Sequence, residues 1–366
     1  MPTIPMKNEK TTPRYSDALL SEMIGKARML ITQQVEEPQD ILYIEENGKK
    51  SILFTLGNIS SIQGQAKSRK TFLNSYICTA LLTNGEFLTF RGKLPFGKSK
   101  IIYFDTEQAH YHAKKVQERI YRLSRISNKE ENDNLQFYRL RPYNTKERIA
   151  IIECVVNSTP NLGFVIIDGI RDLVTDINNA EESTLVIGML MKWSEELNIH
   201  ILCVLHENKG DRNSRGHIGT ELQNKAESVI RVSRDTENKD HSRVEPVYLR
   251  DKDFEPFFFE IPENGYPEIV SGKTAKQAYK LPQDMDDDLH KALVTEVFLI
   301  GQEFSQNKYI EALKNVALKY DVRVGNTGLR SFIPYQLKKG FITDKGEGKA
   351  YKLCSNVNHV MSPKYI

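Results

Sequence analysis

The sequence of 366 residues has few cysteines, a single tryptophan and no long hydrophobic run. No apolar stretch approaches the ~18 residues that a membrane-spanning helix needs, so we expect no membrane partner. The polar residues 1–14 contain prolines and lack the hydrophobic segment of a signal peptide, so we expect a cytoplasmic protein. The cysteines form no C-x-x-C pair, which argues against both a zinc site and a disulfide framework. They are Cys78, Cys154, Cys203 and Cys354.

A large excess of one charge is also missing. Lysine and arginine number 51 against 48 aspartates and glutamates, which leaves a net charge of +3, so any nucleic-acid contact must come from a local basic surface. The hydrophobic content of 39% and the charged content of 27% are those of an ordinary globular protein. At roughly 100–200 residues per domain, the length allows two domains.

The segment Gly64–Thr71, which reads GQAKSRKT, lacks one glycine of a phosphate-binding loop. The pattern G-x-x-x-x-G-K-[ST] finds Gly64, Lys70 and Thr71 in register, but Arg69 stands in the second glycine position. A β-prone run precedes the segment and a helix-like run follows it. We therefore expect ATP and Mg²⁺ as cofactors, with Lys70 at the β- and γ-phosphate oxygens and the Thr71 hydroxyl on the metal. The expected nucleotide contacts are Gly64, Gln65, Ala66, Lys67, Ser68, Arg69, Lys70, Thr71 and Phe72.

The arginine in the glycine position leaves two alternatives open. Glycine lets the backbone approach the phosphates with no Cβ in the way, so Arg69 either obstructs the nucleotide or turns outward and adds a cation beside Lys67 and Lys70. We expect nucleotide binding to be retained, because Lys70 and Thr71 are both present. Slowed hydrolysis stays an open alternative.

Short β-prone runs alternate with helical ones from residue 59 to about residue 260. This order predicts an α/β domain with a mostly parallel sheet and a phosphate site at the carboxyl ends of its strands. The expected strands are Ile59–Ile62, Ile101–Phe104, Leu135–Leu140, Phe164–Ile167, Ile199–Leu205, Ser228–Ser233, Val247–Arg250 and Phe257–Ile261. The expected helices are Phe72–Leu82, Gln108–Leu123, Thr145–Ser158, Ser183–Leu197 and a short one near Leu222.

Smaller units are expected on both sides of this domain. An amphipathic helix within residues 15–35 and a hairpin at Glu46-Asn47-Gly48 precede it. After it, three helices and a glycine-rich hairpin predict a small winged-helix-like domain. The helices are Asp287–Ile300, Gln306–Tyr320 and Gly325–Lys339, and the strands are Phe341–Thr343 and Ala350–Leu353. The expected divisions are an extension over 1–48, the α/β domain over 49–264, a linker over 265–282, the winged-helix-like domain over 283–355 and a tail over 356–366.

Acidic and imidazole side chains follow three of the expected strands. Asp168 ends a run of four apolar residues, the pattern of a buried strand that presents a carboxylate to Mg²⁺. An ordinary core strand that ends in a capping aspartate has the same pattern. Glu107 is placed to polarise an attacking water, or else it caps the next helix together with Asp105 and Thr106. His206 ends a third strand, where it either senses the γ-phosphate or is simply a polar terminus. Together with the phosphate loop, these residues predict a site that hydrolyses nucleotide.

A polar, cationic loop follows His206. Its composition suits contact with the backbone of single-stranded nucleic acid, although a solvated loop reads the same way. The candidate contacts in this loop are Lys209, Arg212 and Arg215. On or beside the third helix of the winged-helix-like domain, where duplex DNA is expected, they are Arg323, Arg330, Lys338 and Lys339.

Residues 50–262 resemble the RecA-superfamily P-loop ATPases, especially the RepA-type hexameric helicases and related ATPases of mobile elements. The resemblance rests on the loop at 64–71, the strand ends at Glu107 and Asp168, and His206 with the loop after it. It implies a RecA-like P-loop core in which Glu107 is the catalytic base and His206 contacts the γ-phosphate. It also implies that Arg250 completes the site of a neighbouring subunit, so that the protein forms a homo-oligomer, expected to be a hexameric ring.

Two functions follow from these expectations. The first is an ATP-dependent DNA motor, similar to a helicase, that acts on single-stranded DNA in replication or mobilisation of a plasmid or mobile element. The alternative is a nucleotide-gated DNA-binding regulator or loader with slow or absent hydrolysis. Sequence-specific binding to duplex DNA by residues 283–355 would favour the second.

Overall fold

The computed structural model describes residues 15–46, 48–207, 216–235, 238–270, 285, 287–320, 326–344 and 350–354. Its contacts separate a first unit, residues 1–39, from a second, residues 40–366. Within the described ranges, the helices are all too short or too polar to cross a membrane.

The described part of the first unit contains one helix, α1 (Asp17–Ala27). Ser16 caps it by accepting a hydrogen bond from the backbone N–H of Leu19 at 3.3 Å. The helix ends well before Val35, the expected end. The residues beyond it include β-branched Ile31, Thr32 and Val35, whose side-chain rotamers are restricted in a helix.

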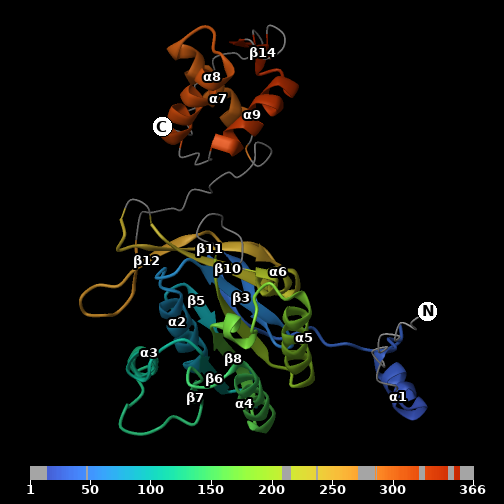
Figure 1. The fold of residues 1–366 in the computed structure, drawn as a ribbon. Coiled ribbons are helices and arrows are strands. Elements are labelled where there is room, and N and C mark those ends of the chain that lie inside the picture. Colours follow the sequence, from blue (N-terminus) through green and yellow to red (C-terminus); the bar gives the residue numbers. More distant parts are fainter. Residues whose placement is uncertain are drawn as a thin grey trace, which may run out of the picture. The chain divides into compact units, whose positions relative to one another are not determined.

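The second unit is built on a nine-stranded sheet with the order β13-β12-β11-β10-β3-β9-β8-β6-β7 (Figure 1). The strands from β10 to β7 in this order run parallel, and β11, β12 and β13 extend the sheet in antiparallel fashion. The expected α/β fold with a mostly parallel sheet is therefore confirmed. The parallel strands are β3 (Ile59–Gly64), β6 (Lys100–Asp105), β7 (Leu135–Arg139), β8 (Leu162–Asp168), β9 (His200–His206) and β10 (Ser228–Arg234), and the antiparallel ones are β11 (Ser242–Leu249), β12 (Phe257–Glu260) and β13 (Glu268–Ile269).

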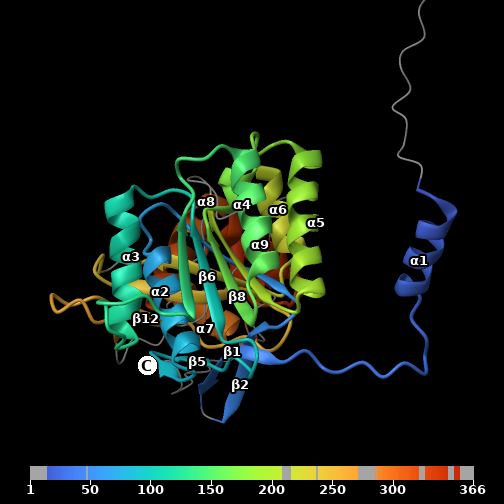
Figure 2. The same ribbon diagram turned by 90° about the horizontal axis from the view of Figure 1, so that it is seen from below.

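Helices cover both faces of this sheet (Figure 2). Alternate residues of each buried strand enter two separate cores, so that Ile166 faces one side and Ile167 the other. Helices α2 (Lys70–Leu82) and α3 (His110–Leu123) pack on the first side. Helices α4 (Thr145–Ser158), α5 (Ala180–Glu196) and α6 (Gly216–Lys225) pack on the second, where the short 3₁₀ helix η1 (Ile170–Leu173) follows β8.

A second sheet of four strands, in the order β2-β1-β5-β4, packs beside α2. Its strands are β1 (Asp40–Glu46), β2 (Lys49–Thr55), β4 (Glu86–Phe87) and β5 (Phe90–Gly92). A Cβ on Gly92 would lie 2.3 Å from the carbonyl oxygen of Ala80, so only glycine lets β5 approach α2 this closely. Strand β1 contributes Ile41 and Leu42 to the core under α2, and the second unit begins at Asp40, ahead of the expected boundary at residue 48.

The C-terminal part contains three helices and a pair of antiparallel strands around a core of its own. The helices are α7 (Asp287–Ile300), α8 (Gln306–Lys319) and α9 (Asn326–Lys338), and the strands are β14 (Ile342–Asp344) and β15 (Tyr351–Leu353). An isolated bridge between Phe304 and Tyr351 adds a third chain segment to the pair. Strand β13 falls inside the expected linker, and the rest of that linker from residue 271, like the expected tail, lies outside the described residues.

Candidate functional site

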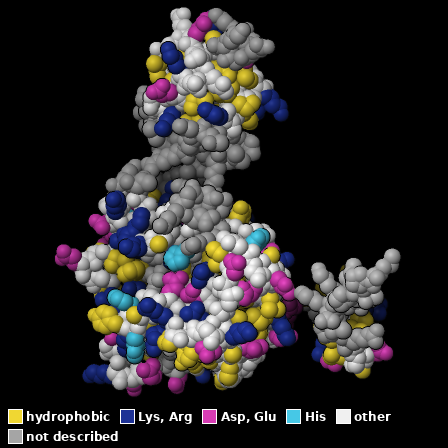
Figure 3. All heavy atoms as spheres, in the orientation of Figure 1, with side chains coloured by type: hydrophobic (Ala, Val, Ile, Leu, Met, Phe, Trp, Pro, Cys, Tyr) yellow, Lys and Arg dark blue, Asp and Glu magenta, His cyan; other side chains and the backbone are white. Residues whose placement is uncertain are grey.

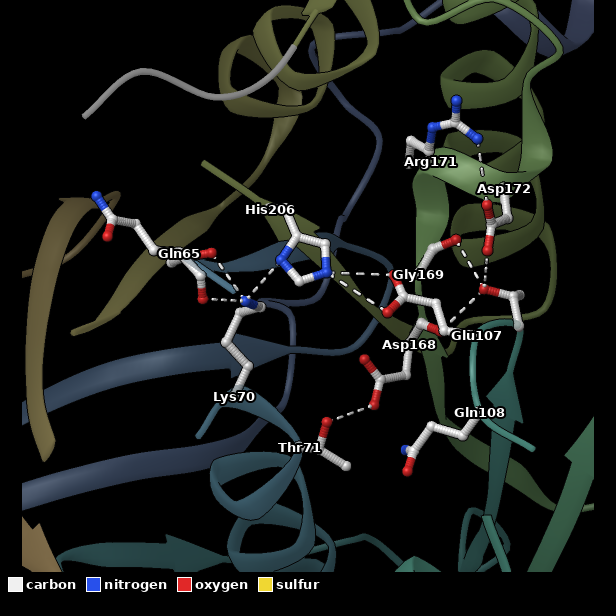
Figure 4. A network of polar contacts seen from close by, with 12 residues as sticks. Gln65, Lys70, Thr71, Glu107, Gln108, Asp168, Gly169, Arg171, Asp172 and His206 are labelled. Carbon is white, nitrogen blue, oxygen red and sulfur yellow. Dashed lines mark hydrogen bonds and ion pairs between the residues drawn. The ribbon is translucent and has the colours of Figure 1, made fainter. Parts of the chain in front are cut away.

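Parallel strands bring the predicted site residues to one edge of the sheet. Strands β3, β9, β8 and β6 are neighbours, and each delivers polar residues where it ends. The loop of residues 64–69 follows β3, His206 ends β9, Asp168 ends β8, and Glu107 follows β6. Their side chains point toward one another in Figure 4.

The backbone of the phosphate loop is held close to strand β10. A Cβ on Gly64 would lie 2.1 Å from the carbonyl oxygen of Val232, so this glycine is required. Lys67 and Arg69 both adopt left-handed backbone angles, with φ of 65° and 75°. This conformation costs a non-glycine residue about 1–2 kcal/mol, which is why glycine is usual in the position of Arg69.

The side chain of Arg69 turns away from the loop, which is the outward alternative of the two considered above. Its Nη1 donates hydrogen bonds to the carbonyl oxygen of Asp240 and to Oγ of Ser242, the latter at 3.5 Å. Both acceptors lie at the start of β11 and in the turn before it. Burial, and then repulsion by Arg234, lower the pKa of Arg69.

Lys70 lies at the centre of the site and is nearly buried. Its Nζ donates to the carbonyl oxygens of Gly64 at 2.8 Å and Gln65 at 2.9 Å, and lies 3.0 Å from Nδ1 of His206. Burial lowers the pKa of Lys70 to about 8, and Asp168, Glu107 and Glu207 oppose that shift. The ammonium is therefore held by two backbone carbonyls and by His206, and the carboxylates act on it through their charge.

His206 connects Lys70 to Glu107. Its Nε2 lies 3.4 Å from Oε2 of Glu107. Because an ammonium can only donate, Nδ1 accepts from Lys70, and this assigns the proton to Nε2, which donates to Glu107. Burial would raise the pKa of Glu107, but the hydrogen bond from His206 and the charges of Lys70 and Arg171 outweigh it and lower that pKa.

Asp105 holds the turn that carries Glu107. Its Oδ1 accepts from the backbone N–H of Glu107 at 3.1 Å and of Gln108 at 2.8 Å. The expected alternative, a cap on the next helix, is wrong, because Ala109 is the N-cap residue of α3 and no side chain caps that helix. The side chain of Glu107 lines the cavity instead. Thr106 fixes the neighbouring turn, since its hydroxyl lies 3.1 Å from the carbonyl oxygen of Asp168.

Asp168 faces the first turn of α2. The hydroxyl of Thr71 donates to Oδ2 of Asp168 at 3.2 Å, and the hydroxyl of Tyr103 donates to the same oxygen at 2.6 Å. Burial raises the pKa of Asp168 to about 6, against the hydrogen bond from Tyr103. Asn74 donates in turn to the Tyr103 hydroxyl at 3.3 Å. Thr71 and Asp168 are thus the described oxygen donors placed to hold a divalent cation.

The site opens into a cavity of about 550 Å³. Six lysines and arginines line it against two acids, Glu107 and Asp168, so the cavity favours an anion. This charge is local, because Lys and Arg are intermixed with Asp and Glu over the face shown in Figure 3. The six cations are Lys67, Arg69, Lys70, Lys115, Arg119 and Arg234.

Two arginines of the cavity and a buried tyrosine behind it were not anticipated. Arg119 stacks on the ring of Phe72 at 3.6 Å, and Arg234 donates through Nε to the carbonyl oxygen of Lys67 at 3.1 Å. In the sequence, Tyr103 is only one residue of an apolar run. A tyrosine inside a fully buried strand nevertheless predicts a buried polar partner nearby, because its hydroxyl needs one.

Other predicted residues lie away from this cavity or outside the described ranges. The backbone N–H of Arg250 donates to the carbonyl oxygen of Glu227, which precedes β10, so Arg250 lies at the opposite end of that strand from Arg234. Arg330 and Lys338 are exposed on α9, whereas Lys339 pairs with Asp287 at 3.0 Å. The residues outside the described ranges are Lys209, Arg212, Arg215 and Arg323.

Residues 50–212 match a family model described as an AAA domain. No curated protein matches the chain. Among solved structures, a KaiC-like protein from the hyperthermophilic archaeon Pyrococcus horikoshii is 15% identical, with a TM-score of 0.41, covering 59% of this chain and 91% of that one. The matched region, which holds the phosphate loop, Glu107, Asp168 and His206, is thus similar to an AAA-type P-loop domain.

Proposed function

We propose that the chain is an ATP-dependent DNA motor of the RecA type, close to the RepA-type helicases, that serves replication or mobilisation of a plasmid or mobile element. The observation that carries this proposal is the convergence of Lys70, Thr71, Asp168, Glu107 and His206 on one cation-lined cavity. Residues from four separate strand ends have no structural need to meet around an open space. Nucleotide hydrolysis uses a lysine on the phosphates, a hydroxyl and a carboxylate on the metal, and a group that orients water, which are the roles open to Lys70, Thr71, Asp168 and Glu107.

The residues fit ATP and Mg²⁺. The cavity carries an excess of positive charge, and Ser68 holds a buried hydroxyl oxygen with no partner among the described residues, close to where phosphates would lie. Thr71 and Asp168 would hold Mg²⁺, whose preference for oxygen ligands they match. When bound, the metal supplies positive charge that offsets the charge developing on the phosphates.

Glu107 is the side chain that would orient the attacking water. In the structure it accepts from His206, which itself accepts from Lys70. A γ-phosphate that draws Lys70 toward itself would leave Nδ1 of His206 without its donor, and would so change the hydrogen bonding of Glu107. His206 would thereby connect the presence of ATP to the base.

A ring of subunits would supply the remaining cation. Arg250 is exposed and lies at the sheet edge opposite its own phosphate loop, a position compatible with a role in a neighbouring site. Within its own unit, α1 buries none of its side chains, and its apolar side (Leu19, Leu20, Met23 and Ile24) supports a further contact between subunits. The hexamer is the assembly we favour on these grounds.

The C-terminal part would bind DNA as a winged helix. Its three helices, its strand pair and the bridge from Phe304 to Tyr351 support this assignment. Arg330 and Lys338 lie exposed with Pro334 between them at intervals of four residues, so they share one face of α9. Lys339 would have to leave Asp287 before it could contact a phosphate.

Steady-state ATP hydrolysis by the purified protein, with and without single-stranded DNA, tests this function. We expect turnover that DNA stimulates and that both Lys70→Ala and Glu107→Gln abolish. Tight ATP binding without turnover would instead select the alternative, a nucleotide-gated regulator or loader. Arg69 in the second glycine position is the feature that favours that alternative, because its left-handed backbone conformation carries a cost that glycine would not. Absence of ATP binding would reject both.

A further inference from the structure

Two arginines connect the phosphate loop to the segment between β10 and β11. Arg69, from the loop, donates to the carbonyl oxygen of Asp240 and to Ser242. Arg234, from the end of β10, donates through Nε to the carbonyl oxygen of Lys67 at 3.1 Å and through Nη1 to that of Lys239 at 2.6 Å. Each arginine therefore bonds from its own segment to the other one. Both connections form although Arg69 stands where a phosphate loop usually has glycine.

These bonds also decide which backbone groups of the loop remain for an anion. Carbonyl oxygens repel phosphate, whereas amide N–H groups attract it. Arg234 occupies the carbonyl oxygen of Lys67, and Lys70 occupies those of Gly64 and Gln65. Arg69 and Arg234 lie close enough for their charges to repel, since Arg234 lowers the pKa of Arg69 after burial has done so. A bound polyanion would relieve that repulsion.

We propose that Arg69 is a positioning residue for the nucleotide, which fastens the left-handed phosphate loop to the β10–β11 turn in the conformation that receives the phosphates. The proposal rests on the proposed function, namely that this loop binds ATP. In a loop with glycine at this position, the backbone itself is free to adopt the left-handed conformation. Here the arginine adopts it at a cost, and its side chain holds it by bonds to a neighbouring strand and turn.

Arg69→Gly, Arg69→Ala and Arg69→Lys separate this role from the effect of backbone strain. Glycine removes both the strain and the connection, whereas alanine removes only the connection. We expect both to weaken binding of mant-ATP, a fluorescent ATP analogue, about tenfold and to raise KM for ATP in parallel, while kcat stays within about twofold. Arg69→Lys, which keeps one charged donor, should recover part of the affinity.

Arg125→Gly is the matched control. Arg125 is exposed after α3, adopts φ of 56°, and is not among the residues that line the cavity. The same exchange of a left-handed arginine for glycine should leave mant-ATP binding unchanged there. Thermal unfolding of each variant shows that a change in affinity is not a loss of folded protein.

Unchanged or tighter mant-ATP binding by Arg69→Gly would overturn the proposal, and would identify Arg69 as an obstacle to the nucleotide. Weakened binding by Arg69→Ala alone would also overturn it, because strain rather than the lost connection would then account for the effect. Wild-type protein that binds no mant-ATP, and whose binding is indistinguishable from that of Lys70→Ala, would reject the proposed function itself. These outcomes differ from one another, so the two failures are distinguishable.

Discussion

Strand β9 has a histidine at each end, and the two differ in their burial and in their contacts. His200, at the start, is fully buried, lies 2.7 Å from the carbonyl oxygen of Thr55 through Nδ1, and stacks on Phe54 with ring centroids 4.4 Å apart. His206, at the carboxyl end, is partly exposed and lines the cavity between Lys70 and Glu107. The end of the strand, rather than the residue type, separates a structural histidine from a candidate functional one.

The carboxylates follow the same division. Glu227, at the edge that carries His200, accepts from the backbone N–H of Thr55 at 3.0 Å and from its hydroxyl at 2.7 Å. Glu107, at the edge that carries His206, has no backbone donor to its side chain among the described contacts and faces the cavity. Removing charge at one edge should therefore cost stability, and at the other it should cost activity.

The exchange of Glu107 and of Glu227 for glutamine gives the largest expected contrast. Glu107→Gln should lower kcat for ATP hydrolysis by about 10²–10⁴-fold, the usual contribution of a positioned base, with little change in stability. Glu227→Gln should retain kcat per folded molecule and lower the free energy of unfolding by about 1–2 kcal/mol. Hydrolysis assays and urea unfolding measure both. Equal losses of activity in the two variants would remove the distinction between the edges.

The buried Asp168 should make stability depend on pH in the absence of divalent cations. Its pKa is about 6 when folded and near 3.8 when unfolded, so the unfolded chain ionises more readily. Stability is therefore lost as pH rises from about 4 to about 6, by up to about 3 kcal/mol. Asp168→Asn removes this contribution. The difference in unfolding free energy between wild type and Asp168→Asn, measured at pH 4 and at pH 7, should change by that amount, and a constant difference would contradict the expectation.

The two histidines of β9 extend the comparison. His206→Ala should lower kcat by about 10²-fold, as the loss of a donor to developing charge does, and leave the unfolding temperature nearly unchanged. His200→Ala should leave kcat unchanged and destabilise the fold by about 2–4 kcal/mol, because it opens a cavity against Phe54. Reversed effects would show that exposure at the sheet edge does not mark the functional residue.

Much of the sheet was predictable because its strands are buried on both faces. A continuous apolar run such as Phe164–Ile167 is typical of a strand in a parallel sheet, and the residues that end such runs then had to meet at one edge. The short strands β4 and β5 were not predicted, because two or three residues carry no periodic signal.

The site residues that the sequence did not predict come from elements other than the expected strand ends. Arg119 enters from the third turn of α3, and Arg234 from the carboxyl end of the neighbouring strand β10, so no local pattern connects either with the phosphate loop. The direction of the Arg69 side chain depends on the position of Asp240, a residue 171 positions away. Such long-range contacts become visible only when the strand order is known.

Tyr103→Phe gives the smallest expected effect. It tests whether a buried side chain that does not line the cavity positions the candidate metal ligand Asp168. The hydroxyl of Tyr103 holds Oδ2 of Asp168, the same oxygen that Thr71 contacts, and Asn74 holds that hydroxyl in turn. Tyr103→Phe should raise the Mg²⁺ concentration needed for half-maximal hydrolysis about tenfold, the lower end for residues that orient a metal ligand.

The same variant has a signature in pH that a loss of packing would not produce. The hydrogen bond from Tyr103 lowers the pKa of Asp168, so removing it should move the acid limb of the hydrolysis profile toward higher pH. Tyr138→Phe is the matched control, because Tyr138 lies on the neighbouring strand β7 and its hydroxyl contacts only Gln136 among the described residues. A shift in neither variant would mean that the candidate metal ligand is held by the carboxyl end of β8 alone, without support from the buried strand beside it. A shift in both variants would mean that the hydrogen bond from Tyr103 is not its cause.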